Sequence, residues 1–185
     1  MGVVNRIPAS LGGPHTHARK WALAALFRVT ARAFGRQPPP IAALSADECV
    51  ARYAAFTQSE AEALLRSGGV VDVVQGRLYQ SAYRLGRACR WVSRVRTVED
   101  ALSLGRALYR TLDIDFQGDE KGEVLISHCS LSRYYSSYTC RVMSAMDRGL
   151  LAGLSAGGVL TFTARITEGQ PCCRARLSMQ GRKPG

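Results

Sequence analysis

The sequence predicts an α+β fold: a helical N-terminal half packed on a small sheet that contains antiparallel strands and ends in a β-hairpin. Two observations support this fold class. Apolar residues recur at helical spacing through most of residues 45–111, whereas a short apolar run and two alternating segments after residue 122 have the pattern of strands. The chain has 185 residues, 46% of them hydrophobic, which fits one domain with a substantial core.

Two regions are expected along the chain. Residues 1–44 are predicted to be an N-terminal extension, partly disordered, with one short basic helix over 18–34, and residues 45–180 a single α+β domain. No Asp or Glu precedes Asp47, and the breaker GRQPPP spans 35–40. The basic helix has the character of a targeting or membrane-surface element, and a dispensable extension is the alternative.

The first helices of the domain carry start and stop signals. Ser45 followed by Glu48 has the form of a capping box, which predicts that a helix begins there. Residues 47–66 suit one long or two short helices, and SGG breaks them. Apolar residues at helical spacing predict the next helix over 70–95.

Thr97 and Asp100 form a second capping box, which predicts a helix over 97–111. The segments RLGRACR and SLGRALYR lie in these two neighbouring helices and carry one glycine each. We expect the glycines to let the two helices approach closely, because a residue without a side chain leaves room for a second backbone. The acidic, glycine-containing residues 113–122 are predicted to form a loop.

The second half contains the strand signals. Residues 123–128 form a short apolar run typical of a buried strand, and 139–154 have helical spacing. Residues 159–167 alternate strictly between apolar and polar, and a turn leads back into a second alternating segment, which together predict a β-hairpin. Neighbours on a strand point to opposite faces, so Cys173 is expected to face the interior and Cys172 the solvent.

Composition excludes several classes of protein. The net charge is +11, but about half of it comes from the first 46 residues, and no nucleic-acid-binding motif is present, so nucleic-acid binding is not expected. Phosphate-cradling loops and the common hydrolase motifs are also absent. The excess of arginine over lysine, with much alanine and glycine, suggests a GC-rich bacterial genome.

The chain is expected to be cytoplasmic, with free thiols and no transmembrane segment. It has six cysteines, fewer than a disulfide scaffold of this length requires, and no secretory leader is recognised. The apolar run WALAALF is too short to span a bilayer. No sequence feature specifies an oligomeric state.

Three thiols are expected to converge: Cys129 at the end of a strand, Cys140 in the first turn of a helix and Cys173 at the start of the last strand. The helix N-terminus is expected to lower the pKa of Cys140, and Cys129 has the position of an exposed nucleophile. His128 can serve as the base for Cys129 only if the strand ends at His128, since within a strand the two neighbouring side chains point to opposite faces. The alternative is that the cysteines are small buried hydrophobes and His128 a hydrogen-bonded strand-end residue.

A metal is a further alternative for these residues. Cys129, Cys140 and Cys173 together with His128 form a ligand set suited to zinc, and exchange of His128 for Cys172 gives four thiolates for an iron–sulfur cluster. The spacing of neither ligand set is diagnostic of a metal. Both sets also require two adjacent residues of one strand, His128 with Cys129 or Cys172 with Cys173, to bind the same metal centre. No cofactor is therefore expected.

Four sequence features follow one another in the chain: VLISHC, a second cysteine after ten intervening residues, MDRGLLAGL, and a late G-x-x-x-C-x-A-x-L. Over roughly residues 48–178 this order resembles the L-2-amino-thiazoline-4-carboxylic acid hydrolase-like family, with a looser similarity to 4-vinyl reductase domains. The matching positions are Cys129, Cys140, Gly149, Gly153 and Cys173. The resemblance implies an α+β domain around a small-ligand pocket and, for the named member, hydrolysis that opens a thiazoline ring.

Two functions follow as hypotheses. The first is a hydrolase of a small cyclic amidine or amide-like substrate, in which Cys129 or Cys140 attacks and His128 transfers a proton. The substrate-binding residues would be Ser130, Arg133, Tyr134, Tyr135, Arg141 and Cys173, with an arginine holding a carboxylate. The alternative is a ligand-binding or sensory module of the 4-vinyl reductase type without catalysis.

Overall fold

The computed structural model describes residues 14–179 and confirms the α+β fold class. The helices are α1 (Pro14–Ala33), α2 (Ala46–Arg66), α3 (Val71–Val92), α4 (Val98–Arg110) and α5 (Ser137–Leu154). The strands are β1 (Ile114–Gly118), β2 (Glu123–Cys129), β3 (Gly158–Ala164) and β4 (Cys173–Met179). Two short 3-10 helices, η1 (Ser130–Arg133) and η2 (Ile166–Glu168), follow β2 and β3.

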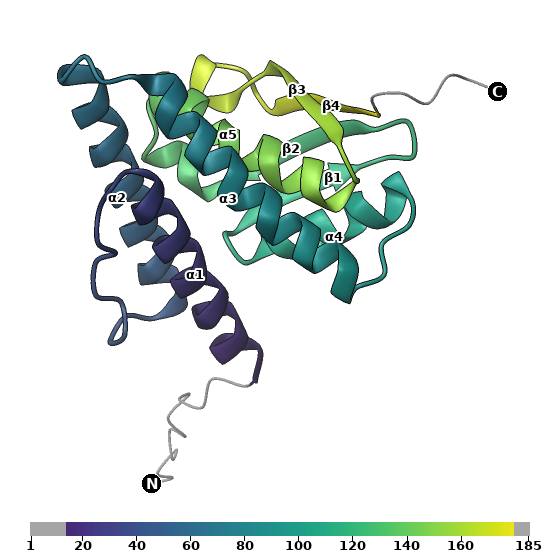
Figure 1. The fold of residues 1–185 in the computed structure, drawn as a ribbon, viewed down its shortest axis with the longest axis horizontal. Helices are drawn as coiled ribbons and strands as arrows, with labels where there is room; N and C mark the ends of the chain where they lie inside the picture. The colour runs from purple at the N-terminus through teal and green to yellow at the C-terminus, as the bar shows by residue number, and fades with distance from the viewer. Residues whose placement is uncertain (1–13, 180–185) are drawn as a thin grey trace, which may run out of the picture.

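The four strands form one antiparallel sheet in the order β1-β2-β4-β3. The predicted C-terminal hairpin is confirmed, with Leu160 opposite Leu177. Helices α4 and α5 contact one face of the sheet, α3 packs on α5, and α1 and α2 lie at the end of the molecule away from the C-terminal hairpin (Figure 1). Along β1 and β4 buried positions alternate with exposed ones, so the opposite face of the sheet is in contact with solvent.

Both predicted capping boxes are present. The Ser45 backbone N–H donates to the Glu48 carboxylate at 2.7 Å, and the Glu48 N–H donates to the Ser45 hydroxyl at 3.3 Å. Thr97 and Asp100 make the equivalent pair of bonds. Each cap contributes about 1 kcal/mol by satisfying N–H groups that have no partner within the helix.

The structure corrects the expected loop at residues 113–122. Ile114 to Gly118 form β1, which pairs with β2. Ile114 and Phe116 point into the core, whereas Asp115 between them is exposed on the solvent side of the sheet. Successive residues of a strand face opposite sides of the sheet, so an acidic residue such as Asp115 can occupy a solvent-facing position without disturbing the core. The acidic composition of the segment concealed this alternation.

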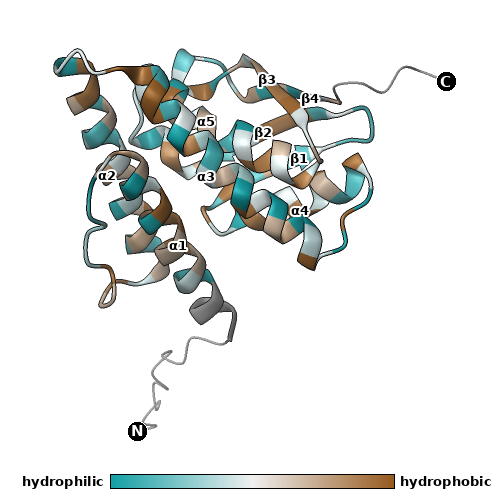
Figure 2. Cartoon of the chain, in the orientation of Figure 1, coloured by the Kyte–Doolittle hydropathy of each residue, from teal (hydrophilic) through white to brown (hydrophobic). Residues whose placement is uncertain are grey.

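The helix of the expected N-terminal extension is part of the domain. Leu23, Phe27 and Thr30 of α1 are buried, and the Phe27 ring meets the Tyr53 ring edge-on with 5.2 Å between centroids. Figure 2 shows apolar positions together with hydrophilic ones on α1. The part of the extension predicted over residues 1–13 lies outside the described residues. Within residues 14–179, no helical segment combines the length and the apolar composition that spanning a bilayer requires.

Glycines do permit a close helix contact, but the partner of α3 is α5, not α4. A Cβ on Gly149 would lie 2.2 Å from the Tyr79 carbonyl oxygen, and one on Gly86 would lie 2.3 Å from the Leu150 carbonyl oxygen. Distances this short exclude any side chain, so the two backbones are in direct contact. Gly105 of α4 instead packs against the side chains of Leu151 and Phe116.

Candidate functional site

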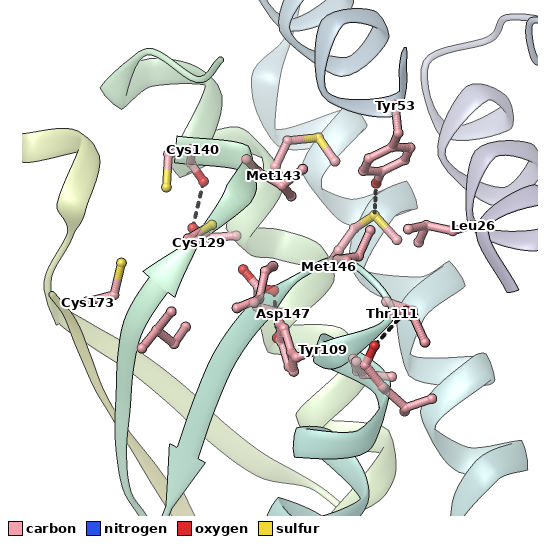
Figure 3. Close-up of a pocket in the computed structure, with 18 of the residues that line it drawn as sticks. Leu26, Tyr53, Tyr109, Thr111, Cys129, Cys140, Met143, Met146, Asp147 and Cys173 are labelled. Atoms are coloured by element: carbon pink, nitrogen blue, oxygen red, sulfur yellow. Dashed lines mark hydrogen bonds between the residues drawn. The ribbon is translucent and has the colours of Figure 1, made fainter. Parts of the chain in front are cut away.

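A cavity of about 170 Å³ lies between the helices and one end of the sheet. The helices α1 to α5 and the strands β1 to β4 all contribute to its wall, so it is a product of the whole fold. Most of the wall is hydrocarbon, as in Leu26, Leu112, Ile126, Met143, Leu150 and Phe162. Figure 3 shows the cysteines on one side of this space and Leu26 and Tyr53 on the other.

The structure brings the three predicted thiols to this one cavity. Cys129 at the end of β2, Cys140 in the first turn of α5 and Cys173 at the start of β4 all line it (Figure 3). The strand register explains two of them, because β2 and β4 are adjacent and Ile126 pairs with Cys173. The predicted inward orientation of Cys173 is confirmed.

The expected activation of Cys140 is wrong. Burial raises the pKa of the Cys129 thiol to about 12, and burial also raises the pKa values of the Cys140 and Cys173 thiols. The helix N-terminus offers the thiol no free donor from Cys140 or Thr139, because the Cys140 N–H donates to the Ser136 carbonyl at 3.0 Å and the Thr139 N–H donates to the Ser136 hydroxyl. A thiol with a raised pKa keeps its proton at neutral pH and is a poor nucleophile.

His128 does not reach the cavity. Strand β2 runs through both His128 and Cys129, so their side chains leave opposite faces of the sheet. The His128 imidazole is half exposed and lies 3.4 Å from the Asp113 carboxylate on the outer face. The proton transfer expected between His128 and a cavity thiol is therefore not supported by the geometry.

Of the predicted substrate-binding residues, Tyr135 and Cys173 line the cavity. The other four do not: Ser130 donates its hydroxyl to the Leu112 carbonyl, Arg141 pairs with Glu168 at 2.9 Å, and Arg133 and Tyr134 are exposed. The arginines that were expected to hold a substrate carboxylate thus point to solvent.

The sequence patterns missed Asp147, the one charged residue among those lining the cavity. The Tyr109 hydroxyl donates to its Oδ1 atom at 2.6 Å, and the Tyr109 ring stacks on Phe116. Burial raises the pKa of Asp147 to about 6, although the Tyr109 hydrogen bond acts in the opposite direction. Asp147 lies seven residues after Cys140, two turns along the same helix face, and this spacing was the available signal.

The hydroxyl groups of the wall are already bonded within the protein. Tyr53 shares a hydrogen bond of 3.1 Å with Thr30, and Tyr135 one of 2.6 Å with Thr57. Ser144 donates to the Cys140 carbonyl. In contrast, the one hydrogen bond that the Asp147 carboxyl accepts from residues 14–179 is that of Tyr109 to Oδ1, and no donor in this range bonds Oδ2. The cavity therefore presents one unoccupied carboxyl oxygen in an apolar wall.

The thiols and His128 do not assemble into a metal site. Among the described residues no three His, Cys, Asp or Glu side chains are placed so that they could hold one metal ion. His128 is on the far side of the sheet from the thiols, which removes the fourth ligand of the zinc alternative.

Fold and site together define an α+β protein that encloses an apolar, thiol-bearing cavity between its helices and an antiparallel sheet. Comparisons of the chain with models of protein families, with curated proteins and with solved structures gave no match.

Proposed function

We propose that the protein is a ligand-binding module whose cavity takes a small apolar molecule with one hydrogen-bond donor. The observation that carries the proposal is Asp147 Oδ2, a carboxyl oxygen without a described partner in a wall that is otherwise hydrocarbon, sulfur and internally bonded hydroxyl. A donor on the ligand would satisfy this oxygen, and the rest of the ligand would replace contacts with water by apolar contacts.

The volume limits the size of the ligand. An engineered apolar cavity of about 150 Å³ binds benzene in another protein, and the cavity here measures about 170 Å³. A single aromatic ring or an aliphatic group of the same size, with one short polar substituent, fits this space.

Charge limits the polar substituent. With a pKa of about 6, Asp147 is mostly ionised at neutral pH. An ammonium or hydroxyl group would donate to the carboxylate, whereas a ligand carboxylate would meet a like charge in a region of low dielectric constant. The proposed ligand class is therefore a small aromatic or branched aliphatic amine or alcohol.

Four probes of one shape test the proposal: benzylamine, benzyl alcohol, toluene and benzoate, titrated by calorimetry at pH 7.5. We expect benzylamine and benzyl alcohol to bind more tightly than toluene, and benzoate not to bind. In Asp147→Asn, an isosteric change, the preference for benzylamine over toluene should shrink. Filling the cavity with Leu26→Trp should remove binding, whereas Arg28→Trp, an exposed position on the same helix, should not. Equal affinity for all four probes, or unchanged binding in Leu26→Trp, would contradict the proposal.

The hydrolase remains a second candidate, favoured by the convergence of Cys129, Cys140 and Cys173 on one cavity. Two features speak against it. Asp147 is the one carboxylate or imidazole among the residues that line the cavity, and a carboxylate of pKa about 6 is too weak a base to deprotonate a thiol of pKa about 12. A carboxylate-bearing thiazoline would also be repelled by Asp147. Turnover of such a substrate by the protein, lost in Cys129→Ser, would favour the hydrolase over the binding module.

A further inference from the structure

The helix α3 and the turn that follows it carry a concentration of positive charge. Residues 73–98 contain six arginines and no acidic residue. Five of the six are exposed: Arg77, Arg84, Arg87, Arg94 and Arg96. None of the six arginines takes part in an ion pair between residues in the range 14–179.

Part of this charge lies on one side of the helix. Val73, Arg77, Arg84, Arg87 and Trp91 follow one another at intervals of three, four or seven residues and are all exposed. These intervals place them along a single face, about 27 Å long, which we call the α3 face. The opposite side of α3 packs on α5, so the α3 face points away from the protein.

Apolar side chains stand at the ends of the α3 face. Trp91 is 85% exposed and its neighbour Val92 is 77% exposed, while Val73 at the other end is 49% exposed. The exposed tryptophan and valine side chains leave apolar surface in water next to positive charge, and a partner that offers both negative charge and hydrocarbon would match both.

We propose that the α3 face docks on the surface of an anionic lipid bilayer. The arginines would lie at the level of the lipid phosphates, and Trp91 would occupy the interfacial region that tryptophan prefers. Nucleic acid would match the charge and could stack on Trp91, but its phosphate backbone offers nothing to Val73 and Val92. The lipid interior accommodates valine side chains, which is why we favour the bilayer. The proposal is independent of what fills the cavity.

Tryptophan fluorescence provides the first test. The chain has two tryptophans, so Trp21→Phe leaves Trp91 as the only reporter. With vesicles of 30% phosphatidylserine in phosphatidylcholine, we expect a blue shift of Trp91 emission and quenching by brominated lipid. Vesicles of phosphatidylcholine alone should give neither, and salt should weaken the effect because the attraction is electrostatic. Unchanged Trp91 emission in the presence of bound vesicles would overturn the assignment of this face.

Matched charge variants provide the second test, by vesicle co-sedimentation of the full chain. Each arginine near an anionic surface changes partitioning about fivefold, so Arg84→Gln with Arg87→Gln should lower it about 25-fold. The control pair, Arg133→Gln with Arg174→Gln, removes the same charge at exposed positions outside α3 and should change partitioning much less. Equal losses in both pairs would show that net charge alone is responsible. Binding of a 30-base-pair duplex without binding of vesicles would replace the bilayer with nucleic acid.

Discussion

Replacement of Asp147 by asparagine should change how the stability of the protein depends on pH. Asparagine has the size of aspartate and can still accept the Tyr109 hydrogen bond, but it does not ionise. In the wild type, burial raises the pKa of Asp147 from an ordinary value of 3.8 to about 6. The folded state therefore holds this proton more tightly than the unfolded state does, and raising the pH destabilises the fold.

The structure sets the magnitude and the pH window. A difference of roughly two pKa units corresponds to about 3 kcal/mol, because each unit is worth about 1.4 kcal/mol. This stability is fully present below the unfolded-state pKa of 3.8 and is lost as the pH rises through about 6. Between pH 4 and pH 8 the wild type should lose about 2 kcal/mol relative to Asp147→Asn, most of it before pH 6.

Urea unfolding of the two proteins at half-unit steps from pH 4 to pH 8 provides the assay. Subtraction of the two free energies of unfolding at each pH removes the contribution of every other titrating group. The difference should increase with pH and become constant above about pH 7. A difference that stays constant over the whole range would show that Asp147 is not desolvated by the cavity wall.

Three further outcomes are expected. Tyr109→Phe removes a hydrogen bond that lowers the pKa of Asp147, so the carboxyl should titrate above pH 6 in carbon-13 NMR spectra, whereas Tyr134→Phe, at an exposed tyrosine, should leave it unchanged. Gly149→Ala places a methyl group 2.2 Å from the Tyr79 carbonyl and should lower the free energy of unfolding by about 1 to 3 kcal/mol or more, while Gly76→Ala, with open space around it, should be neutral or stabilising. In native protein at pH 7.5, Cys129, Cys140 and Cys173 should react with a maleimide much more slowly than in urea, because burial raises the pKa of each thiol; one fast thiol among them would favour the hydrolase.

Sequence patterns confined to a few neighbouring residues predicted two kinds of element, helix starts and the C-terminal hairpin. The capping boxes at Ser45 and Thr97 involve residues three apart, and the β3–β4 hairpin has a clear two-residue alternation, so both could be recognised without tertiary information. Strand β1 was missed because its exposed position Asp115 and its flanks Asp113 and Asp119 are acidic, and acidic composition is also typical of loops. Only its pairing with β2 makes it a strand.

The candidate site was predicted in part for a similar reason. The order of strand, helix and hairpin was sufficient to bring Cys129, Cys140 and Cys173 together. It was not sufficient for the Asp147–Tyr109 pair, whose members are 38 residues apart in the chain. A single aspartate in a helix has the pattern of a solvent-exposed residue, and only the packing of α4 against α5 removes it from water. The same burial reverses the pKa expected for Cys140 from its place at a helix N-terminus.

Methyl NMR of methionine can show directly whether the cavity admits a small apolar ligand. The chain has four methionines, of which Met143 and Met146 line the cavity and Met179 lies on β4 outside it. On titration of carbon-13-methyl-labelled protein with benzyl alcohol, we expect ring-current shifts of Met143 and Met146 and nuclear Overhauser contacts from the ring to both methyl groups, with Met179 unaffected. Shifts confined to Met179, or no shift of any methionine at millimolar ligand, would contradict this expectation.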